Sequence, residues 1–338
     1  MTPSQQIESE VAASVATISP ANNSVAPASD LSFRSCELDA FTVRYEIVGP
    51  RGAPVVAVLG GISSSRHVCS TEGDPSPGWW EDVVGPGLAI DTLRFRVLGI
   101  DYFSGNGQST PVTTADQATA LASALDRAGV GVLHALVGAS YGGMVALAFG
   151  ADYPTRVKRL LVISAAHESD PMATALRLLQ RRVVALGRSA GRERDGLAIA
   201  RGIAMTSYVT AQHFEDRISN CDRRDSQVIA NRIEEYLRTR GEQFAASWTS
   251  ERYNALSLSL DLHSVRPEDV SVPTTVIAVS GDRLVPITQS RELASRLGGP
   301  SQLIELDSPF GHDAFLGDWA RIAPFVEELL RLGVEVQS

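Results

Sequence analysis

Short apolar runs alternate with segments of helical periodicity along most of the chain. The apolar runs are rich in β-branched residues and predict strands over residues 41–48, 54–59, 94–100, 132–137, 157–163, 274–279 and 301–306. Apolar residues recur at helical spacing over residues 114–128, 144–153, 289–297 and 319–332. Buried strands that alternate with helices are typical of a mostly parallel sheet covered on both faces. The pattern therefore predicts an α/β fold.

A different pattern extends from His167 to Arg266. Apolar residues recur there at helical spacing, arginine is frequent, and no run predicts a strand. A stretch of roughly 100 residues is far longer than an ordinary loop, so we expect a helical insertion. The predicted division of the chain is a flexible N-terminal tail over residues 1–30, a core over 31–166 and 271–338, and a helical lid insertion over 167–270.

The composition is that of a globular protein, and it excludes several classes of function. Of the 338 residues, 44% are hydrophobic, and the net charge of −9 argues against a nucleic-acid-binding protein, whose binding face is basic. Lys158 is the single lysine, so no phosphate-binding loop ends in Gly-Lys-Ser/Thr. The three cysteines are far apart, which excludes a paired-cysteine metal motif. We expect neither a metal nor a bound cofactor.

The chain contains no feature that predicts contact with a membrane. No apolar run reaches the roughly 18 residues of a membrane-spanning helix. The first 30 residues lack the basic start and long apolar centre of a secretory signal. We therefore expect a cytoplasmic protein with no membrane partner.

The motif Gly138-Ala139-Ser140-Tyr141-Gly142 lies directly after a predicted strand and before a predicted helix. In such a G-x-S-x-G turn the residues two before and two after the serine must be small, because strand and helix approach closely. Ser140 would stand at the helix N-terminus, where the backbone N–H of Tyr141 can stabilise an oxyanion. We predict that Ser140 is a nucleophile; a turn serine without chemistry is the plainer alternative.

A serine nucleophile needs a base and an acid that orients it. Of the six histidines, only His312 follows the last predicted strand, where the base of such a Ser–Asp–His order lies. His134 lies inside a predicted strand and is expected to be a core residue. Asp282 follows the penultimate predicted strand and is the predicted acid, with Asp307 as its competitor.

The second oxyanion donor should come from the loop after an early strand. Gly60, Gly61 and Ile62 follow the apolar run that ends at Leu59. Glycine lets a backbone approach a substrate closely, so an N–H group of this loop is the predicted donor.

Further motifs lie outside the serine turn and are more specific than it. They are Gly78-Trp79-Trp80-Glu81-Asp82, Gly85-Pro86-Gly87-Leu88-Ala89-Ile90-Asp91-Thr92, Gln180-Arg181, Glu234-Glu235-Tyr236-Leu237 and Gly311-His312-Asp313-Ala314-Phe315-Leu316. With these motifs the chain resembles the homoserine O-acetyltransferase family, acyltransferases of methionine biosynthesis, from about residue 41 to residue 332. The resemblance implies an α/β-hydrolase fold with a helical lid, and a homodimer that pairs through the insertion.

The resemblance also implies roles for single residues. It makes Ser140, Asp282 and His312 the catalytic triad. It assigns the oxyanion donors to the N–H groups of Tyr141 and Ile62, and Gly61 is the nearest alternative to Ile62.

The same resemblance implies how the amino-acid substrate is bound. Arg181 matches the arginine that binds the substrate carboxylate, and a bidentate guanidinium suits that task. Asp313 matches the acid that binds the substrate ammonium group, and Tyr236 belongs to the pocket wall. A solvated helix arginine and a helix-capping carboxylate are the plainer alternatives for Arg181 and Asp313.

The residues around the acyl group depart from the family pattern. Gly-Ala-Ser-Tyr-Gly stands where acetyl-transferring members usually have Gly-Gly-Ser-Met-Gly, and Gly60-Gly61-Ile62 stands where they have His-Ala-Leu. Similar chains include succinyl-CoA users, so we favour succinyl over acetyl. A succinyl donor needs a cation near its distal carboxylate, and Arg66, Arg283 or another arginine could serve.

The leading hypothesis is a two-step acyl transfer from acyl-CoA to the hydroxyl of L-homoserine, with ping-pong kinetics. A serine O-acyltransferase of cysteine biosynthesis is one alternative. A serine esterase or hydrolase with the same triad is another, and a binding protein without catalysis is the third.

Overall fold

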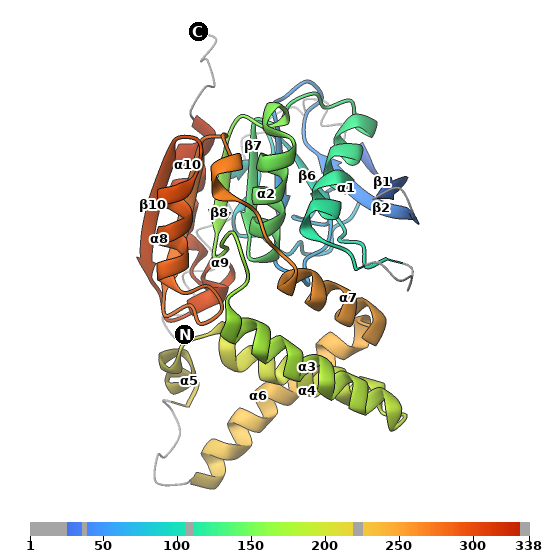
Figure 1. Ribbon diagram of the computed structural model, residues 1–338, viewed down its shortest axis with the longest axis vertical. Helices are drawn as coiled ribbons and strands as arrows, with labels where there is room; N and C mark the ends of the chain where they lie inside the picture. The colour runs from blue at the N-terminus through green and yellow to red at the C-terminus, as the bar shows by residue number, and fades with distance from the viewer. Residues whose placement is uncertain (1–25, 36–38, 106–110, 219–225, 332–338) are drawn as a thin grey trace, which may run out of the picture.

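The computed structural model describes residues 26–35, 39–105, 111–218 and 226–331. Within them, an eight-stranded sheet has the order β1-β2-β6-β3-β7-β8-β9-β10 (Figure 1). Its strands are β1 (Ala26–Ser35), β2 (Asp39–Val48), β3 (Val55–Leu59), β6 (Arg96–Ile100), β7 (Ala135–Ala139), β8 (Leu160–Ile163), β9 (Thr274–Ser280) and β10 (Ser301–Asp307). From β6 to β10 all neighbours are parallel, and β2 is antiparallel to both β1 and β6. The predicted, mostly parallel sheet is confirmed.

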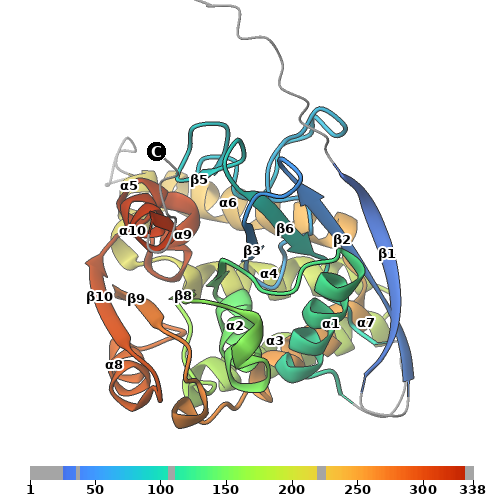
Figure 2. The same ribbon diagram turned by 90° about the horizontal axis from the view of Figure 1, so that it is seen from above.

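Apolar side chains cover both faces of the sheet, which is why its strands are near-continuous hydrophobic runs. In β3, for example, Ala57 and Leu59 face one core cluster while Val56 and Val58 face the other. Helices α1 (Thr114–Arg127), α2 (Tyr141–Asp152) and α8 (Ile287–Arg296) lie on one face, and α10 (Trp319–Arg331) lies on the other (Figure 2). The short strands β4 (Val84–Gly85) and β5 (Ile90–Asp91) belong to the segment that packs beside α10.

The chain between β8 and β9 forms helices that lie together below the sheet in Figure 1. They are α3 (Pro171–Ser189), α4 (Glu193–Tyr208), α5 (Ala211–Ile218), α6 (Ser226–Ser247) and α7 (Ser250–Asp261). We call α3–α7 the helical roof. It has a small core of its own around Val184, Leu197 and Tyr253. No helix within the described ranges is long and apolar enough to cross a bilayer.

The first strand begins before the boundary that the composition suggested. Residues 26–30, the end of the predicted tail, belong to β1, which pairs with β2 along most of its length. The sequence Ala-Pro-Ala-Ser-Asp at its start shows no alternation of apolar and polar residues, so no strand was predicted there. The strand forms by pairing with β2. Residues 1–25 lie outside the described part of the chain.

Candidate active site

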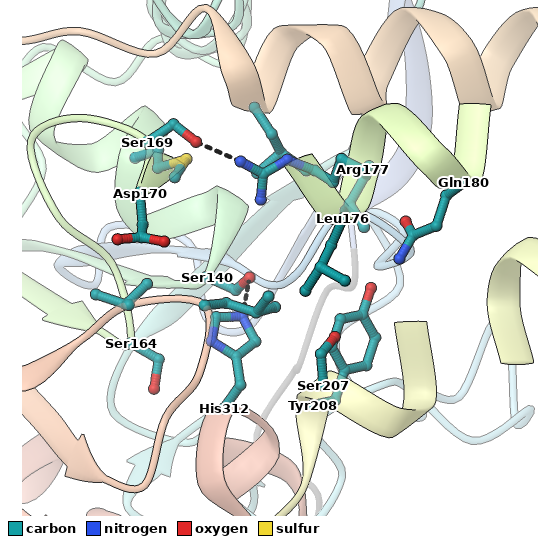
Figure 3. Close-up of a pocket in the computed structure, with 15 residues that line it drawn as sticks. Ser140, Ser164, Ser169, Asp170, Leu176, Arg177, Gln180, Ser207, Tyr208 and His312 are labelled. Atoms are coloured by element: carbon teal, nitrogen blue, oxygen red, sulfur yellow. Dashed lines mark hydrogen bonds between the residues drawn. The ribbon is translucent and has the colours of Figure 1, made fainter. Parts of the chain in front are cut away.

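Three side chains that are far apart in sequence form a continuous hydrogen-bonded chain. The Oγ of Ser140 lies 2.7 Å from Nε2 of His312 (Figure 3). Nδ1 of His312 lies 2.8 Å from Oδ2 of Asp282. With a neutral ring, Ser140 donates to Nε2 and the Nδ1–H donates to Asp282. This is the geometry that lets a histidine take a serine proton while a carboxylate holds its tautomer.

A strained turn presents Ser140. Its backbone has φ 54° and ψ −120°, which lies in a region that a non-glycine residue seldom adopts. A Cβ on Gly138 would come within 2.3 Å of the Gly142 carbonyl oxygen, and one on Gly142 within 2.2 Å of the Leu59 carbonyl oxygen. The turn therefore requires glycine on both sides of the serine, as the motif predicted.

Asp282 follows β9 and is held by its own loop. One carboxylate oxygen accepts the backbone N–H groups of Leu284 and Val285 at 2.8 and 3.0 Å, and the other accepts from His312. Its side chain is buried. The competitor Asp307 is exposed in β10, so the structure joins Asp282 and not Asp307 to the histidine.

His312 lies in a short 3-10 turn after β10 and is buried. Burial by itself lowers the pKa of the ring. The charge and hydrogen bond of Asp282 and the charge of Asp313 outweigh burial, so the pKa of His312 is raised above its usual value. Arg177 opposes this increase, which places its positive charge within electrostatic range of the ring.

The loop after β3 lies against the serine turn. The Gly60 carbonyl oxygen accepts the Tyr102 hydroxyl at 2.7 Å and the Gly142 N–H at 2.9 Å, which holds the loop in place. A Cβ on Gly61 would lie 3.9 Å from the Cβ of Ser140. Within the described residues the N–H groups of Gly61, Ile62 and Tyr141 have no acceptor, so they are free to bind an oxyanion. The choice between Gly61 and Ile62 stays open.

Only the backbone of Tyr141 faces the reaction. Its side chain is buried beneath the turn, where the hydroxyl lies 2.7 Å from Oγ of Ser259 and the ring packs edge-on against Tyr102. Burial raises the pKa of the Tyr141 hydroxyl, so the group is neutral at physiological pH. The side chain supports the turn and connects it to α7 of the roof.

A cavity of about 50 Å³ opens above Ser140 and His312. Its walls come from both parts of the molecule. The core contributes Ile62 and Val285. The roof contributes Leu176, Arg177 and Tyr208 (Figure 3). The cavity therefore lies where the core and the roof meet.

The residues predicted to bind the amino acid lie around this cavity, outside its lining. Arg181 forms an ion pair with Asp261 at 2.6 Å and donates to Oγ of Ser257 at 2.9 Å. Asp313 and Tyr236 line a neighbouring cavity. Burial raises the pKa of the Asp313 carboxyl group.

Two charged residues that the sequence analysis did not single out line the cavity: Arg177 and Asp170. Asp170 caps the N-terminus of α3, where its Oδ1 accepts the N–H groups of Met172 and Ala173. Arg177 lies one helical turn before Arg181. The spacing of four residues could have identified it, since it places both arginines on one face of a helix.

The arginines considered for a succinyl carboxylate lie elsewhere. Arg66 forms an ion pair with Asp101 at 2.7 Å. Arg283 is exposed and donates to the Thr206 carbonyl oxygen. Neither lines the cavity above Ser140.

Comparison with known proteins places these features in context. Residues 54–318 match the model of the alpha/beta hydrolase fold family. The chain is 41% identical to a homoserine O-succinyltransferase of Xanthomonas campestris pv. campestris, over 93% of this chain and 88% of that one. It is 32% identical to a serine O-succinyltransferase of Litchfieldella anticariensis, over 88% and 95% of the two chains.

Solved structures show the same fold in proteins of lower sequence identity. The crystal structure of esterase E22 superposes with a TM-score of 0.79 at 21% identity, and covers 90% of this chain and 99% of that one. At this identity the likeness concerns the fold alone.

Proposed function

The chain belongs to the alpha/beta hydrolase fold family and, within it, to the homoserine and serine O-acyltransferases, and we propose that it transfers a succinyl group from succinyl-CoA to the hydroxyl of L-homoserine. Homoserine O-acyltransferase activity follows from the relative at 41% identity. The observation that carries the mechanism is the hydrogen-bonded chain from Ser140 through His312 to Asp282, at the base of a cavity that the roof covers.

The first half-reaction acylates Ser140. His312 takes the hydroxyl proton as Oγ attacks the thioester carbonyl carbon, and Asp282 stabilises the imidazolium that forms. The N–H groups of Tyr141 and the Gly61–Ile62 loop hold the negative oxygen; one such donor is worth roughly 10²–10³ in rate. The carbon–sulfur bond then breaks, His312 returns the proton to the CoA thiolate, and an acyl-serine ester remains.

The second half-reaction transfers the acyl group. The homoserine hydroxyl gives its proton to His312 and attacks the ester carbon, after which Ser140 leaves and recovers a proton from the ring. Transfer exceeds hydrolysis only if the acceptor is held close to the ester while water is excluded. A well-oriented reactant reaches effective molarities of roughly 10⁵ M or more, and the roof over the cavity supports this orientation.

For binding of the acceptor we propose the same residues that the family resemblance implies. We propose that Arg181 binds the homoserine carboxylate, that Asp313 binds its ammonium group and that Tyr236 lines the acceptor's path. None of the three lines the cavity that contains Ser140. Arg181 lies in α3 of the roof, and Asp313 and Tyr236 line the neighbouring cavity.

Measurement of free thiol tests this function directly. The protein is incubated with succinyl-CoA or acetyl-CoA, alone and with L-homoserine or L-serine. We expect thiol release that depends on homoserine and is faster with succinyl-CoA. Release that continues beyond one equivalent of enzyme without an acceptor would indicate a hydrolase. Release that depends on serine alone would indicate serine O-acyltransferase activity, as in the name of the second relative. No release with either donor would refute the acyltransferase.

We also propose a homodimer that forms through the roof, in the cytoplasm. Large apolar side chains are exposed on α3 and α4; they are Met172, Leu178, Leu179, Leu186 and Ile199. Exposed apolar groups that cluster on one surface are typical of a protein interface. Light scattering should give twice the mass of one chain, and substitution of Leu179 and Leu186 by Glu should give the monomer.

A further inference from the structure

In the roof, the carboxylate of Asp261 forms ion pairs with two arginines, Arg177 and Arg181. Oδ1 of Asp261 lies 2.6 Å from Nε of Arg177, and Oδ2 lies 2.6 Å from Nη2 of Arg181. All three side chains are largely shielded, with exposed fractions of 8%, 11% and 17% for Asp261, Arg177 and Arg181. Within the described residues no other acid forms an ion pair with either arginine. The three side chains together therefore carry one net positive charge where solvent is largely excluded, and a further carboxylate would offset it. Asp170 lines the same cavity as Arg177, but its Oδ1 accepts the N–H groups of its own helix.

The cavity above Ser140 is where such an anion can enter. Arg177 lines this cavity together with Ser140 and His312, whereas Arg181 does not. Nε of Arg177 donates to Asp261, and Nη2 donates to Oγ of Ser169. Its Nη1 has no acceptor among the described residues. Figure 3 shows the guanidinium group on the roof side of the cavity, opposite Ser140 and His312.

Arg177 is also held in a fixed position. The ion pair with Asp261 and the bond to Ser169 restrain two of its nitrogens, and Asp170 anchors the start of its helix. A guanidinium that is oriented before a ligand arrives loses little conformational entropy on binding. The positive charge of Arg177 also lowers the pKa of His312, in agreement with its position on the cavity wall.

Another arginine near the cavity is already engaged. Arg201 lines an adjoining cavity, and its guanidinium lies over the rings of Tyr208 and Phe244 at 5.1 and 5.4 Å. It does not line the cavity that contains Ser140.

We propose that Arg177 binds the distal carboxylate of the acyl group and so selects succinyl-CoA over acetyl-CoA. This inference deepens the proposed function and rests on it for the identity of the donor. In this arrangement the ester carbonyl is bound at Ser140 and the carboxylate at Nη1 of Arg177. Ile62 and Leu260 line the same cavity and offer apolar surface to the two methylene groups between them. An acetyl group fills the same place at the serine but leaves the arginine without its anion. A site with a buried polar group left unpaired discriminates more strongly than a site that loses an apolar contact.

The experiment measures donor choice in Arg177→Met. The substitution keeps an unbranched side chain, and Asp261 keeps its pair with Arg181. We expect kcat/KM for succinyl-CoA to fall about 100-fold, the scale of one lost charge-assisted contact. The kcat/KM for acetyl-CoA and the KM for homoserine should stay within about threefold, the size of a minor packing change. Arg177→Lys keeps the positive charge but loses the planar guanidinium group. Its kcat/KM for succinyl-CoA should therefore lie between the values of the wild type and Arg177→Met.

A second substrate pair separates this inference from the proposed function. Mono-4-nitrophenyl succinate and 4-nitrophenyl acetate acylate a serine without CoA or acceptor, so they report acyl selectivity even in a protein that is a hydrolase. The wild type should prefer the succinate ester, and Arg177→Met should lose that preference. Arg188→Met is the matched control: Arg188 lies on the same helix, exposed and paired with Glu251, and its loss should leave the preference unchanged.

Three results would overturn the proposal. An unchanged succinate-to-acetate ratio in Arg177→Met would show that the distal carboxylate is bound elsewhere. A raised KM for homoserine with an unchanged donor ratio would assign Arg177 to the acceptor. An equal loss with both esters, accompanied by a lower melting temperature, would make its role structural.

Discussion

The catalytic core and the helical roof position their side chains by different physical means. In the core, backbone geometry sets the site: Ser140 occupies a strained turn between close glycines, and two backbone N–H groups fix Asp282. In the roof, side chains hold one another, as in the cluster where Asp261 pairs with Arg177 and Arg181. We therefore expect the core to determine the reaction and the roof to determine which molecules reach the serine.

This difference has a consequence for mutation. A change in the core should lower the rate with every donor and acceptor, because each substrate uses the same serine, base and oxyanion site. A change in the roof should alter KM or donor selectivity and leave the chemistry with simple esters intact. The predictions below test that division.

Ser140→Ala should have the largest effect. Without the hydroxyl no acyl-enzyme forms, and we expect kcat to fall by at least about 10⁴-fold with any donor, the scale seen when a triad nucleophile is removed. Thiol release and the burst with 4-nitrophenyl esters should both disappear, while the melting temperature stays near that of the wild type. Full turnover in this variant would end the case for a serine mechanism.

Asp282→Asn should come next. The amide cannot accept the Nδ1–H in the same orientation and favours the wrong ring tautomer, so kcat should fall by about 10⁴-fold with little change in KM. Asp307→Asn is the control, because Asp307 is exposed and lies outside the hydrogen-bonded chain. An equal fall in kcat in the two variants would show that Asp282 has no special role in orienting His312.

Arg181→Leu tests the roof. Loss of the bidentate cation should raise the KM for homoserine by about 100-fold, the effect of one strong charge-assisted pair. Acylation of Ser140 by 4-nitrophenyl acetate should proceed at the wild-type rate. Arg182→Leu changes the exposed neighbour and should leave both values unaltered. Slower acylation in Arg181→Leu would show that core and roof are not separable.

Asp313→Asn should give the smallest effect, at the boundary between the two regions. The carboxylate stabilises the imidazolium of His312 and raises its pKa. Without that charge the pKa falls, so the neutral base persists to lower pH. The acid limb of the acylation rate with 4-nitrophenyl acetate should therefore move to lower pH. A shift to higher pH would contradict this sign.

Prediction from the sequence succeeded where a short segment decides its own structure. The strands β2, β3 and β6 to β10 and the helices α1 and α10 lie close to their predicted ranges, whereas the short strands β4 and β5 were not predicted. The turn at Ser140 could be predicted because its requirement for small residues depends only on the neighbouring positions. Asp282 and His312 follow the ends of late parallel strands, and such ends meet at one edge of a sheet, so their order along the chain was sufficient. The start of β1 was not predicted because this strand forms by pairing with β2 and has no clear pattern of its own.

The contents of the pocket could not be derived in the same way. Arg177 and Arg181 are four residues apart on one amphipathic helix, and periodicity treats them alike. Which of them faces the nucleophile depends on how α3 is rotated and on the position of Asp261 in α7, more than 80 residues later. Likewise, the sequence placed Asp313 beside the base, and packing turned it toward a neighbouring cavity.

The amino-acid sequence by itself determined the fold class, the nucleophile and the order of the triad, because these follow from local backbone constraints and from strand topology. Only the tertiary structure decided which charged side chains line the cavity beside Ser140. Those charges belong to helices whose relative rotation is set by packing between distant segments, and no local pattern encodes it.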